Sequence, residues 1–370
     1  MPRDDSSAST ATARPIVERL EGRRLFAVFA PIVTNTPLVA DGSIASAART
    51  DANLIDPRGI SLAPDGSLWV ASHGTGTSTV YSGGGVPQPS AGPLVVKVPG
   101  ALGTLHSAPT GMVRHAGGGF VVSAAGKSAP SSFLYATDGG IIAGWAAAVD
   151  PANAITGVDH SASGDVFKGL ATIGTGPGAR IYATDFHNGR VEVFNSRFNP
   201  VALRRNAFTD IQVPAGYAPF GIQVLKNNVY VTYARQDAAR LNDNAGPAQG
   251  IVDMYSPAGK LLRRVGTGGD LNSPWGLAIA PSTWGVYKND LLVGNNGDGT
   301  ISIFDKHDTF LAQVLDPASP FGAPLTIDGL WGLAIGKGKA AKTLFYTSGP
   351  SLGAGGLFGS LTATRPKRTR

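Results

Sequence analysis

The sequence predicts an all-β chain that folds as a six-bladed β-propeller. Its 370 residues include 50 glycines and 26 prolines, and 42% of them are hydrophobic, which is enough to bury a large core. No stretch combines a sustained helical period with good helix formers. A glycine followed by a short apolar strand recurs six times, at spacings of 52, 58, 52, 55 and 56 residues, which indicates six copies of one supersecondary unit. The six glycines are Gly59, Gly111, Gly169, Gly221, Gly276 and Gly332.

Each copy carries signals for four antiparallel strands. The fifth shows them best, with apolar segments 276–280 (GLAIA) and 290–295 (DLLVGN), the turn 296–299 (NGDG), and segment 300–305 (TISIFD). Asn-Gly and Asp-Gly supply the positive φ angles that short hairpin turns require. Four-stranded units at a period near 50 residues are typical of propeller blades, whose first strands line a crowded central axis.

The two ends of the chain are expected to close the ring together. The last copy supplies three strands and lacks a fourth, and residues 36–40 (TPLVA) precede the first copy without a partner of their own. Because a ring must not leave an exposed edge strand, we expect this segment to add as the outer strand of blade six. The predicted organisation is a disordered targeting-type segment over 1–32, the propeller over 33–362, and a basic tail over 363–370.

Charge and cysteine content exclude several classes of function. The net charge is +6, but the two ends account for most of it, and the body, with 22 basic and 21 acidic residues, is almost neutral. A nearly neutral body lacks the excess of basic residues that binding to the phosphates of nucleic acid requires. The absence of cysteine removes disulfides and thiolate metal sites. The longest apolar run near the N-terminus, 25–33, is too short for a transmembrane helix. We expect a monomer.

Whole phrases of the sequence resemble a known group of proteins. The segments DPRGISLAPDGSLWVAS, SPWGLAIAP, LLVGNNGDGTISIFD and IDGLWGLAIG are similar to NHL-type propellers and to an uncharacterised family of bacterial, mostly exported proteins. The resemblance covers about residues 33–362 and implies a six-bladed propeller without an established activity. Residues 17–27 (VERLEGRRLFA) resemble an LEPR-type export signature, although Gly22 stands where that pattern has proline. An extracellular, periplasmic or cell-surface location is therefore expected.

The residue before each glycine is expected to ring the mouth of the central channel. Loops that carry function gather on one face of such a scaffold. Aromatic rings there could stack on a sugar or a planar ligand, and cations could recognise carboxylate or phosphate. Packing between blades is the alternative role for the aromatic residues. The ring consists of Arg58, Thr110, Lys168, Phe220, Trp275 and Trp331.

A second ring is expected after the second strand of each blade. Asp185 and Asn295 offer the hard oxygen ligands that suit Ca²⁺ or Mg²⁺. The Asn188-Gly189 and Asp298-Gly299 pairs also fit plain hairpin turns. Two longer segments, 146–166 and 235–249, are candidate recognition loops on the same face. The second ring consists of His73, Lys127, Asp185, His187, Asn188, Arg235, Asp237, Asn295 and Asp298.

Motifs for known chemistry are missing from the sequence. Propeller lactonases hold a divalent ion with a glutamate, two asparagines and an aspartate, but the Glu-Gly-Pro-type segment that opens their pattern does not occur here. Only Glu192 among three glutamates lies in the body. No zinc spacing, nucleophile elbow or phosphate loop appears.

The sequence thus favours a non-catalytic binding module for a glycan, protein or small molecule. The ligand-binding candidates are Arg58, Lys168, Phe220, Trp275, Trp331, His73 and Arg235. The alternative is a hydrolase or lyase that uses a divalent ion, held by Asp185 and Asn295, in the central channel. No other cofactor is expected.

Overall fold

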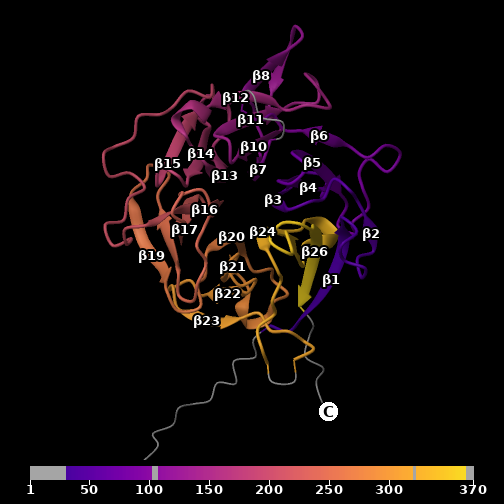
Figure 1. Ribbon diagram of the computed structural model, residues 1–370, viewed down its shortest axis with the longest axis vertical. Helices are drawn as coiled ribbons and strands as arrows, with labels where there is room; N and C mark the ends of the chain where they lie inside the picture. The colour runs from indigo at the N-terminus through magenta and orange to yellow at the C-terminus, as the bar shows by residue number, and fades with distance from the viewer. Residues whose placement is uncertain (1–30, 102–106, 320–321, 364–370) are drawn as a thin grey trace, which may run out of the picture.

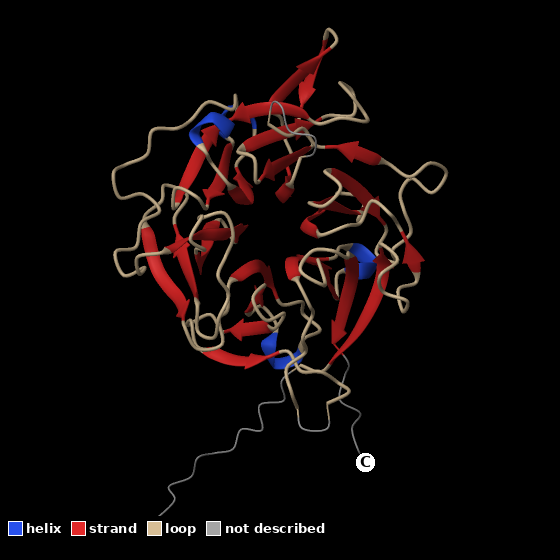
Figure 2. Cartoon of the chain, in the orientation of Figure 1, coloured by secondary structure: helices blue, strands red, loops and turns tan. Residues whose placement is uncertain are grey.

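Six β-sheets surround a central axis in the computed structural model of the chain (Figure 1). The structure describes residues 31–101, 107–319 and 322–363. Almost all regular structure there is β-strand, with four single-turn 3₁₀ helices (Figure 2). The predicted six-bladed, all-β fold is confirmed, while the predicted N-terminal segment and basic tail lie almost entirely outside the described residues.

Blades one to three come from the N-terminal half of the chain. Blade one comprises β3 (Pro57–Leu62), β4 (Leu68–Ser72), β5 (Thr77–Tyr81) and β6 (Val95–Lys97). Blade two comprises β7 (Pro109–Arg114), β10 (Phe133–Thr137), β11 (Ile141–Trp145) and β12 (Ile155–Asp159), with the added hairpin of β8 (Val121–Ala124) and β9 (Lys127–Pro130). Blade three comprises β13 (Phe167–Ile173), β14 (Arg180–Asp185) and β15 (Arg190–Asn195), with η1 (Ser161–Ser163) before β13 and η2 (Gly176–Gly178) between β13 and β14.

Blades four to six complete the ring. Blade four comprises β16 (Tyr217–Leu225), β17 (Asn228–Arg235), β18 (Gly250–Tyr255) and β19 (Leu261–Thr267). Blade five comprises β20 (Pro274–Ile279), β21 (Leu291–Asn295), β22 (Ile301–Phe304) and β23 (Phe310–Gln313), with η3 (Gly285–Tyr287). Blade six comprises β24 (Leu330–Ile335), β25 (Thr343–Ser348), β26 (Leu357–Ala363), β1 (Val33–Ala40) and β2 (Arg49–Thr50), with η4 (Gly338–Ala340).

The ring closes through the N-terminal strand, as predicted. β1 pairs antiparallel with β26, from Val33 opposite Ala363 to Ala40 opposite Leu357. The hydroxyl of Tyr346 on β25 donates a hydrogen bond to Asn35 of β1, with 2.8 Å between the oxygens. Both ends of the described chain therefore contribute to one sheet, and the propeller has no free edge at that point.

The recurring glycines allow the inner strands to approach one another around the axis. A Cβ atom on Gly59 would lie 2.6 Å from the carbonyl oxygen of Thr110 in blade two. A Cβ atom on Gly221 would lie 2.2 Å from the carbonyl oxygen of Trp275 in blade five. Real side chains do not tolerate such distances, so each inner strand needs glycine where it touches the backbone of the next blade.

Threonines on second strands hold this contact in place. The Thr232 hydroxyl lies 2.8 Å from the Gly221 amide, which donates to it, and donates in turn to the carbonyl of Pro274 at 2.5 Å. Thr184 in blade three and Thr347 in blade six repeat the arrangement. Each such hydroxyl satisfies two buried backbone groups from two blades, which fixes neighbouring blades to each other.

Blade two differs from the sequence-based expectation. The hairpin β8–β9 lies between its first and second strands, so Lys127 lies at the end opposite the channel mouth. Segment 146–166 contains β12, the regular outer strand of this blade, and is therefore not an insertion. Segment 235–249 does join the second and third strands of blade four at the mouth. Blade three has three strands, and its outer edge is marked only by a bridge between Phe194 and Pro200.

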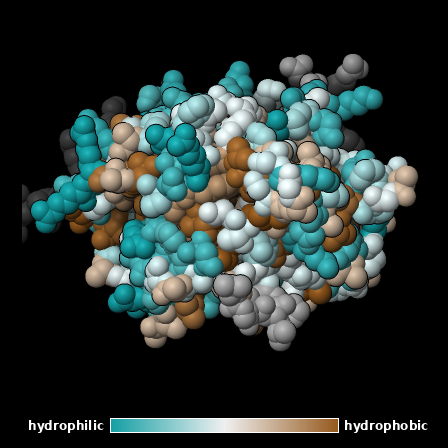
Figure 3. All heavy atoms as spheres, turned by 90° about the horizontal axis from the view of Figure 1, so that it is seen from above, coloured by the Kyte–Doolittle hydropathy of each residue, from teal (hydrophilic) through white to brown (hydrophobic). Residues whose placement is uncertain are grey.

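The molecule is a disc whose core lies between the blades. Apolar clusters form where the faces of adjacent sheets meet, and many of their side chains are fully buried. The edge of the disc in Figure 3 intersperses hydrophilic and hydrophobic side chains. Among the described residues, no helix has both the length and the hydropathy needed to span a membrane.

Candidate functional site at the channel mouth

A β-bulge in each inner strand projects one residue toward the channel. In blade one, Pro57 pairs with Ser72 and Gly59 pairs with Ala71, so Arg58 is an extra residue without a partner on β4. The register shifts at the corresponding position of the other five inner strands. Bulges commonly redirect a side chain in this way, and here they gather one from each blade at the mouth.

The three predicted aromatic residues meet and fill the channel mouth. The ring centroids of Trp275 and Trp331 are 5.7 Å apart with the planes nearly perpendicular, and those of Phe220 and Trp331 are 5.8 Å apart. Phe220 is fully buried, Trp331 is 9% exposed, and Trp275 is half-buried. The Trp275 indole N–H donates to the carbonyl of Lys168 in blade three, two blades away, at 3.2 Å. These rings pack against one another, so most of their surface is unavailable to a ligand.

Charged side chains from blades one to three form a network beside the aromatic residues. Asp138 is its centre: its carboxylate lies 2.9 Å from Lys168 Nζ, 2.9 Å from His73 Nε2 and 3.5 Å from Arg58 Nη1. Asp56 is the second acceptor, 2.8 Å from Arg58 Nη2 and 3.3 Å from His73 Nδ1. The structure thus brings Arg58, Lys168 and His73 together, in agreement with the sequence-based grouping.

Arg58 joins the charged and aromatic halves of the mouth. Its guanidinium carbon lies 4.4 Å from the centroid of a Trp331 ring, within cation–π range. Its side chain is 11% exposed and keeps both of its ion pairs in that position. The guanidinium therefore both stacks and ion-pairs, which a lysine at this position could not reproduce.

Burial and mutual charge shift the protonation equilibria of this network. Burial alone would raise the pKa of Asp138, but Lys168, the hydrogen bond from His73 and the charge of Arg58 hold that pKa well below its ordinary value. Burial lowers the pKa of Lys168, and the carboxylate of Asp138 works in the opposite direction. The pKa of Asp56 is also lowered, because its contacts with His73 and Arg58 outweigh burial. Both carboxylates are therefore ionised at neutral pH.

Asp138 was missed by the sequence-based search. The segment 121–130 has the sequence pattern of a second strand, so Lys127 was predicted at the position that Asp138 occupies in the structure. One signal was available, because the tetrapeptide YATD occurs twice, ending at Asp138 and at Asp185, and both mark the end of a second strand. Thr110, at the ring position of blade two, donates its hydroxyl hydrogen to the carbonyl of Phe167 and has a structural role.

Arg235 lies apart from this network. It is exposed at the end of β17, where the 235–249 loop begins, and its carbonyl accepts a hydrogen bond from the Asn244 amide. Gln236 next to it donates to the carbonyl of Phe186, which packs on Phe220. Arg235 is thus on the mouth face but at its rim.

The two predicted metal ligands lie in different blades and organise their own loops. Asp185 ends β14 in blade three, and its Oδ1 accepts the backbone N–H groups of Val166 and Asn188, each at 3.2 Å. Asn295 ends β21 in blade five, and its Oδ1 accepts the backbone N–H of Asn272 at 3.2 Å. The Oδ1 atoms that we expected to bind metal thus accept backbone N–H groups, some of them from a different loop.

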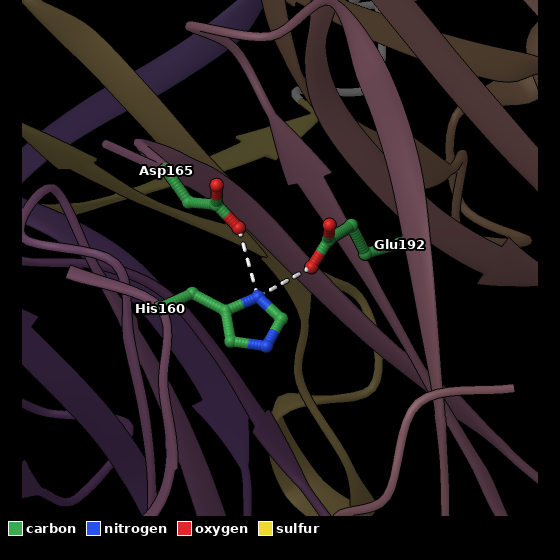
Figure 4. A group of neighbouring side chains, drawn as sticks. All are labelled: His160, Asp165 and Glu192. Carbon is green, nitrogen blue, oxygen red and sulfur yellow. Dashed lines mark hydrogen bonds and ion pairs between the residues drawn. The ribbon is translucent and has the colours of Figure 1, made fainter. Parts of the chain in front are cut away.

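A group of possible metal ligands does lie at the seam between blades two and three (Figure 4). His160 Nδ1 is 2.9 Å from an oxygen of Asp165 and 3.0 Å from an oxygen of Glu192. One ligand atom from each residue lies within 4.8 Å of the other two. Arg190, half-exposed, bridges Glu192 at 2.6 Å and the neighbouring Asp185 at 3.1 Å. Burial, followed by the charge of Asp165, raises the pKa of Glu192. A histidine with two carboxylates could hold a divalent ion.

The channel is nearly closed below the mouth. Apolar residues of the inner strands, among them Ile60, Ile222 and Leu333, leave a cavity of about 20 Å³, with Trp275 at its wall. That volume is close to the minimum that holds one water molecule. A ligand at the mouth would therefore lie above this apolar constriction and would not pass through the channel.

No protein-family profile matches the chain, but three proteins of Acanthamoeba polyphaga mimivirus are similar to it. Uncharacterized protein R640 is 31% identical over 62% of this chain, which spans only 42% of that protein's length. Uncharacterized protein R648 is 30% identical over 85% of this chain and 76% of its own length. The chain belongs to the family of this viral protein. Uncharacterized protein L690 is 28% identical over 90% of the chain and 85% of its own length. These relatives are viral, which corrects the expectation of a bacterial family.

Solved structures of similar fold include one enzyme. A catalytically inactive variant of virginiamycin B lyase from Staphylococcus aureus, solved with quinupristin, covers 90% of this chain with a TM-score of 0.50. A structural genomics protein of unknown function from Bacteroides thetaiotaomicron covers 90% with a TM-score of 0.53. Both are 12% identical in sequence, so the similarity concerns the fold alone.

Proposed function

We propose that the protein is a non-catalytic binding module that holds a polar ligand on its channel-mouth face. The observation that carries this proposal is the buried charge at the mouth. Lys168 is 2% exposed and pairs with Asp138, which also contacts Arg58, and Arg58 in turn pairs with Asp56. Desolvating such groups is costly, and apolar side chains of similar size often stabilise a protein as well or better. Charge retained at this cost is typical of a functional site.

The balance of charge favours a neutral, hydroxyl-bearing ligand such as a glycan. Two carboxylates offset Arg58 and Lys168, so the mouth presents both donors and acceptors without a net charge. His73 and Asp138 have side chains that are 24% and 21% exposed, and the half-buried Trp275 offers part of a ring for stacking. Arg235 at the rim would make an outer contact.

The geometry of His73 argues for binding over catalysis. Both of its ring nitrogens face carboxylate oxygens, Nε2 at 2.9 Å from Asp138 and Nδ1 at 3.3 Å from Asp56. A general base needs a free nitrogen within reach of the proton that it removes. His73 is therefore better placed to donate hydrogen bonds and fix the network than to accept a proton.

A glycan array followed by calorimetry on the strongest glycan tests this proposal. We expect Trp275→Ala and Asp138→Asn to weaken binding at least about tenfold, since each removes a stacking surface or a charged acceptor. Asp150→Asn, which changes a partly exposed aspartate between β11 and β12 at the opposite end of blade two, is the control and should bind like the wild type. Equal affinity in all three variants would refute a mouth site. Export or surface association remains a proposal, because residues 1–30 lie outside the described structure.

A divalent-metal-dependent hydrolase or lyase is the second candidate. It is favoured by the His160, Asp165 and Glu192 group, which lies next to the predicted ligand Asp185. Metal analysis and thermal shifts with Ca²⁺ and with EDTA separate the two candidates. A stoichiometric ion, lost in Asp165→Asn, would favour the enzyme, whereas an unchanged melting temperature would leave the binding module.

A further inference from the structure

A pocket of about 400 Å³ opens between blades one and two on the face opposite the channel mouth. It is bounded by the turn after β3, by the loop between β5 and β6, and by the adjoining ends of β7, β10 and β11, which lie side by side in Figure 1. Pockets of this size hold small organic molecules. Nothing in the mouth network reaches it, so its role is separate from the proposed function.

Aromatic side chains form one wall of this pocket. The rings of Trp69 and Phe133, from two different blades, stack with centroids 4.0 Å apart and planes at 21°. Trp145 lies 4.8 Å from Trp69, and its indole N–H is already bonded to the carbonyl of Pro151. Each of these three residues keeps only a small exposed edge. The wall is therefore rigid and presents apolar ring edges, because the faces of Trp69 and Phe133 cover each other.

Arg114 lines the same pocket and has no partner for its charge. It ends β7, is half-buried, and its guanidinium makes no ion pair or hydrogen bond with any residue that the structure describes. Two other such arginines, Arg58 and Arg264, each contact two carboxylates, and Arg180 and Arg49 each donate to a backbone carbonyl. A half-buried cation without a counter-charge is costly, and a bound anion would relieve that cost.

His115 next to it turns its ring to the other face of the blade, where it packs edge-on against Phe120 with centroids 4.7 Å apart. Its Nε2 lies 2.7 Å from the carbonyl oxygen of Gly118, so Nε2 carries the hydrogen and donates it. Burial lowers the pKa of His115, the hydrogen bond to Gly118 works in the opposite direction, and the nearby charge of Arg114 lowers the pKa further. Arg114 is thus the charged group beside the aromatic wall.

The surroundings of the pocket add positive charge. It shares Asp65, Ser67 and Gln88 with an adjacent hollow of about 710 Å³ between blades one and six. Lys337 and Lys339 line that hollow and are exposed. Three cations against the single carboxylate of Asp65 favour the approach of an anion.

We propose that this pocket binds a small planar carboxylate, with its ring system against Trp69 and Phe133 and its carboxylate on the guanidinium of Arg114. The aromatic edges of the wall suit a ring packed edge-to-face against them, and the fork of Arg114 matches the two carboxylate oxygens. The chemistry differs from that at the mouth, where the charges are balanced.

Calorimetric titration of the full chain with 2-naphthoate and with its neutral counterpart 2-naphthamide tests the proposal. We expect naphthoate to bind at least about tenfold more tightly than the amide, as the loss of one charge-assisted pair predicts. Arg114→Gln should remove this preference. Arg180→Gln, a half-buried arginine at the same end of blade three that donates to the carbonyl of Ala179, should preserve it.

A pocket-filling variant locates the ligand. Gln88 lines the pocket, and Gln88→Trp should abolish binding of both probes while the melting temperature stays unchanged. Equal affinities for the two probes, a preference that survives Arg114→Gln, or no binding of naphthoate would each overturn the proposal.

Discussion

Phe220 of blade four and Trp331 of blade six meet across the channel, with ring centroids 5.8 Å apart, although blade five lies between them in the ring. This aromatic contact links two blades that are not neighbours in the ring. Trp331→Ala would leave a cavity in the middle of the molecule, and we expect it to cost roughly 3–5 kcal/mol of the free energy of unfolding. Urea denaturation measures this loss. Trp275→Ala, at a half-buried position, should cost less, and the opposite ranking would contradict the packing role.

Gly221→Ala tests the close approach at the axis. The added methyl group would lie 2.2 Å from the carbonyl oxygen of Trp275, and backbone atoms cannot yield easily. We expect a fall in melting temperature of several degrees or failure to fold. Gly92→Ala is the matched control, because a Cβ there meets nothing within 4 Å and its φ is not positive. Similar melting temperatures for both variants would refute the axial crowding.

Deletion of residues 31–45 tests the closure of the ring. This deletion removes β1, exposes the edge of β26, and leaves Leu361 and Phe358 without their partners. Thermal unfolding should shift to much lower temperature, and aggregation should increase, relative to the full chain. An unchanged transition would mean that blade six does not depend on this strand.

Asp253 should make stability depend on pH. Burial raises its pKa from 3.8 to about 6, despite hydrogen bonds from Arg264 and Tyr255. The folded state therefore binds the proton more tightly than the unfolded state, so this group contributes stability below 3.8 that is lost as pH rises through about 6. A plot of the free energy of unfolding against pH should be flatter over this range for Asp253→Asn than for the wild type. A variant with the same slope as the wild type would show that Asp253 does not titrate in that window.

Much of the fold could be predicted because it depends on local signals that repeat. The spacing of the six glycines reflects a backbone contact that every blade must make. The place of residues 36–40 could be predicted because blade six lacks a strand and this segment has no other partner. The bulged positions, including Arg58 and Trp331, could be found because they precede those glycines.

The pairing at the mouth could not be predicted in the same way. Lys168 meets Asp138 from the neighbouring blade, and their contact depends on how far each bulge turns its side chain. The β8–β9 hairpin has the alternation of an ordinary strand pair, so its place outside the blade is set by tertiary packing and not by its sequence. The pocket at Arg114 likewise exists only where two blades meet.

The double variant Lys168→Met with Asp138→Asn gives the most direct test, because it removes the buried ion pair while keeping side chains of similar size. If the pair serves ligand binding, the free energy of unfolding should stay the same or rise, because Arg58 and His73 retain Asp56 as a partner, while binding of the glycan selected on the array is lost. A variant that unfolds readily but binds that glycan like the wild type would contradict the account.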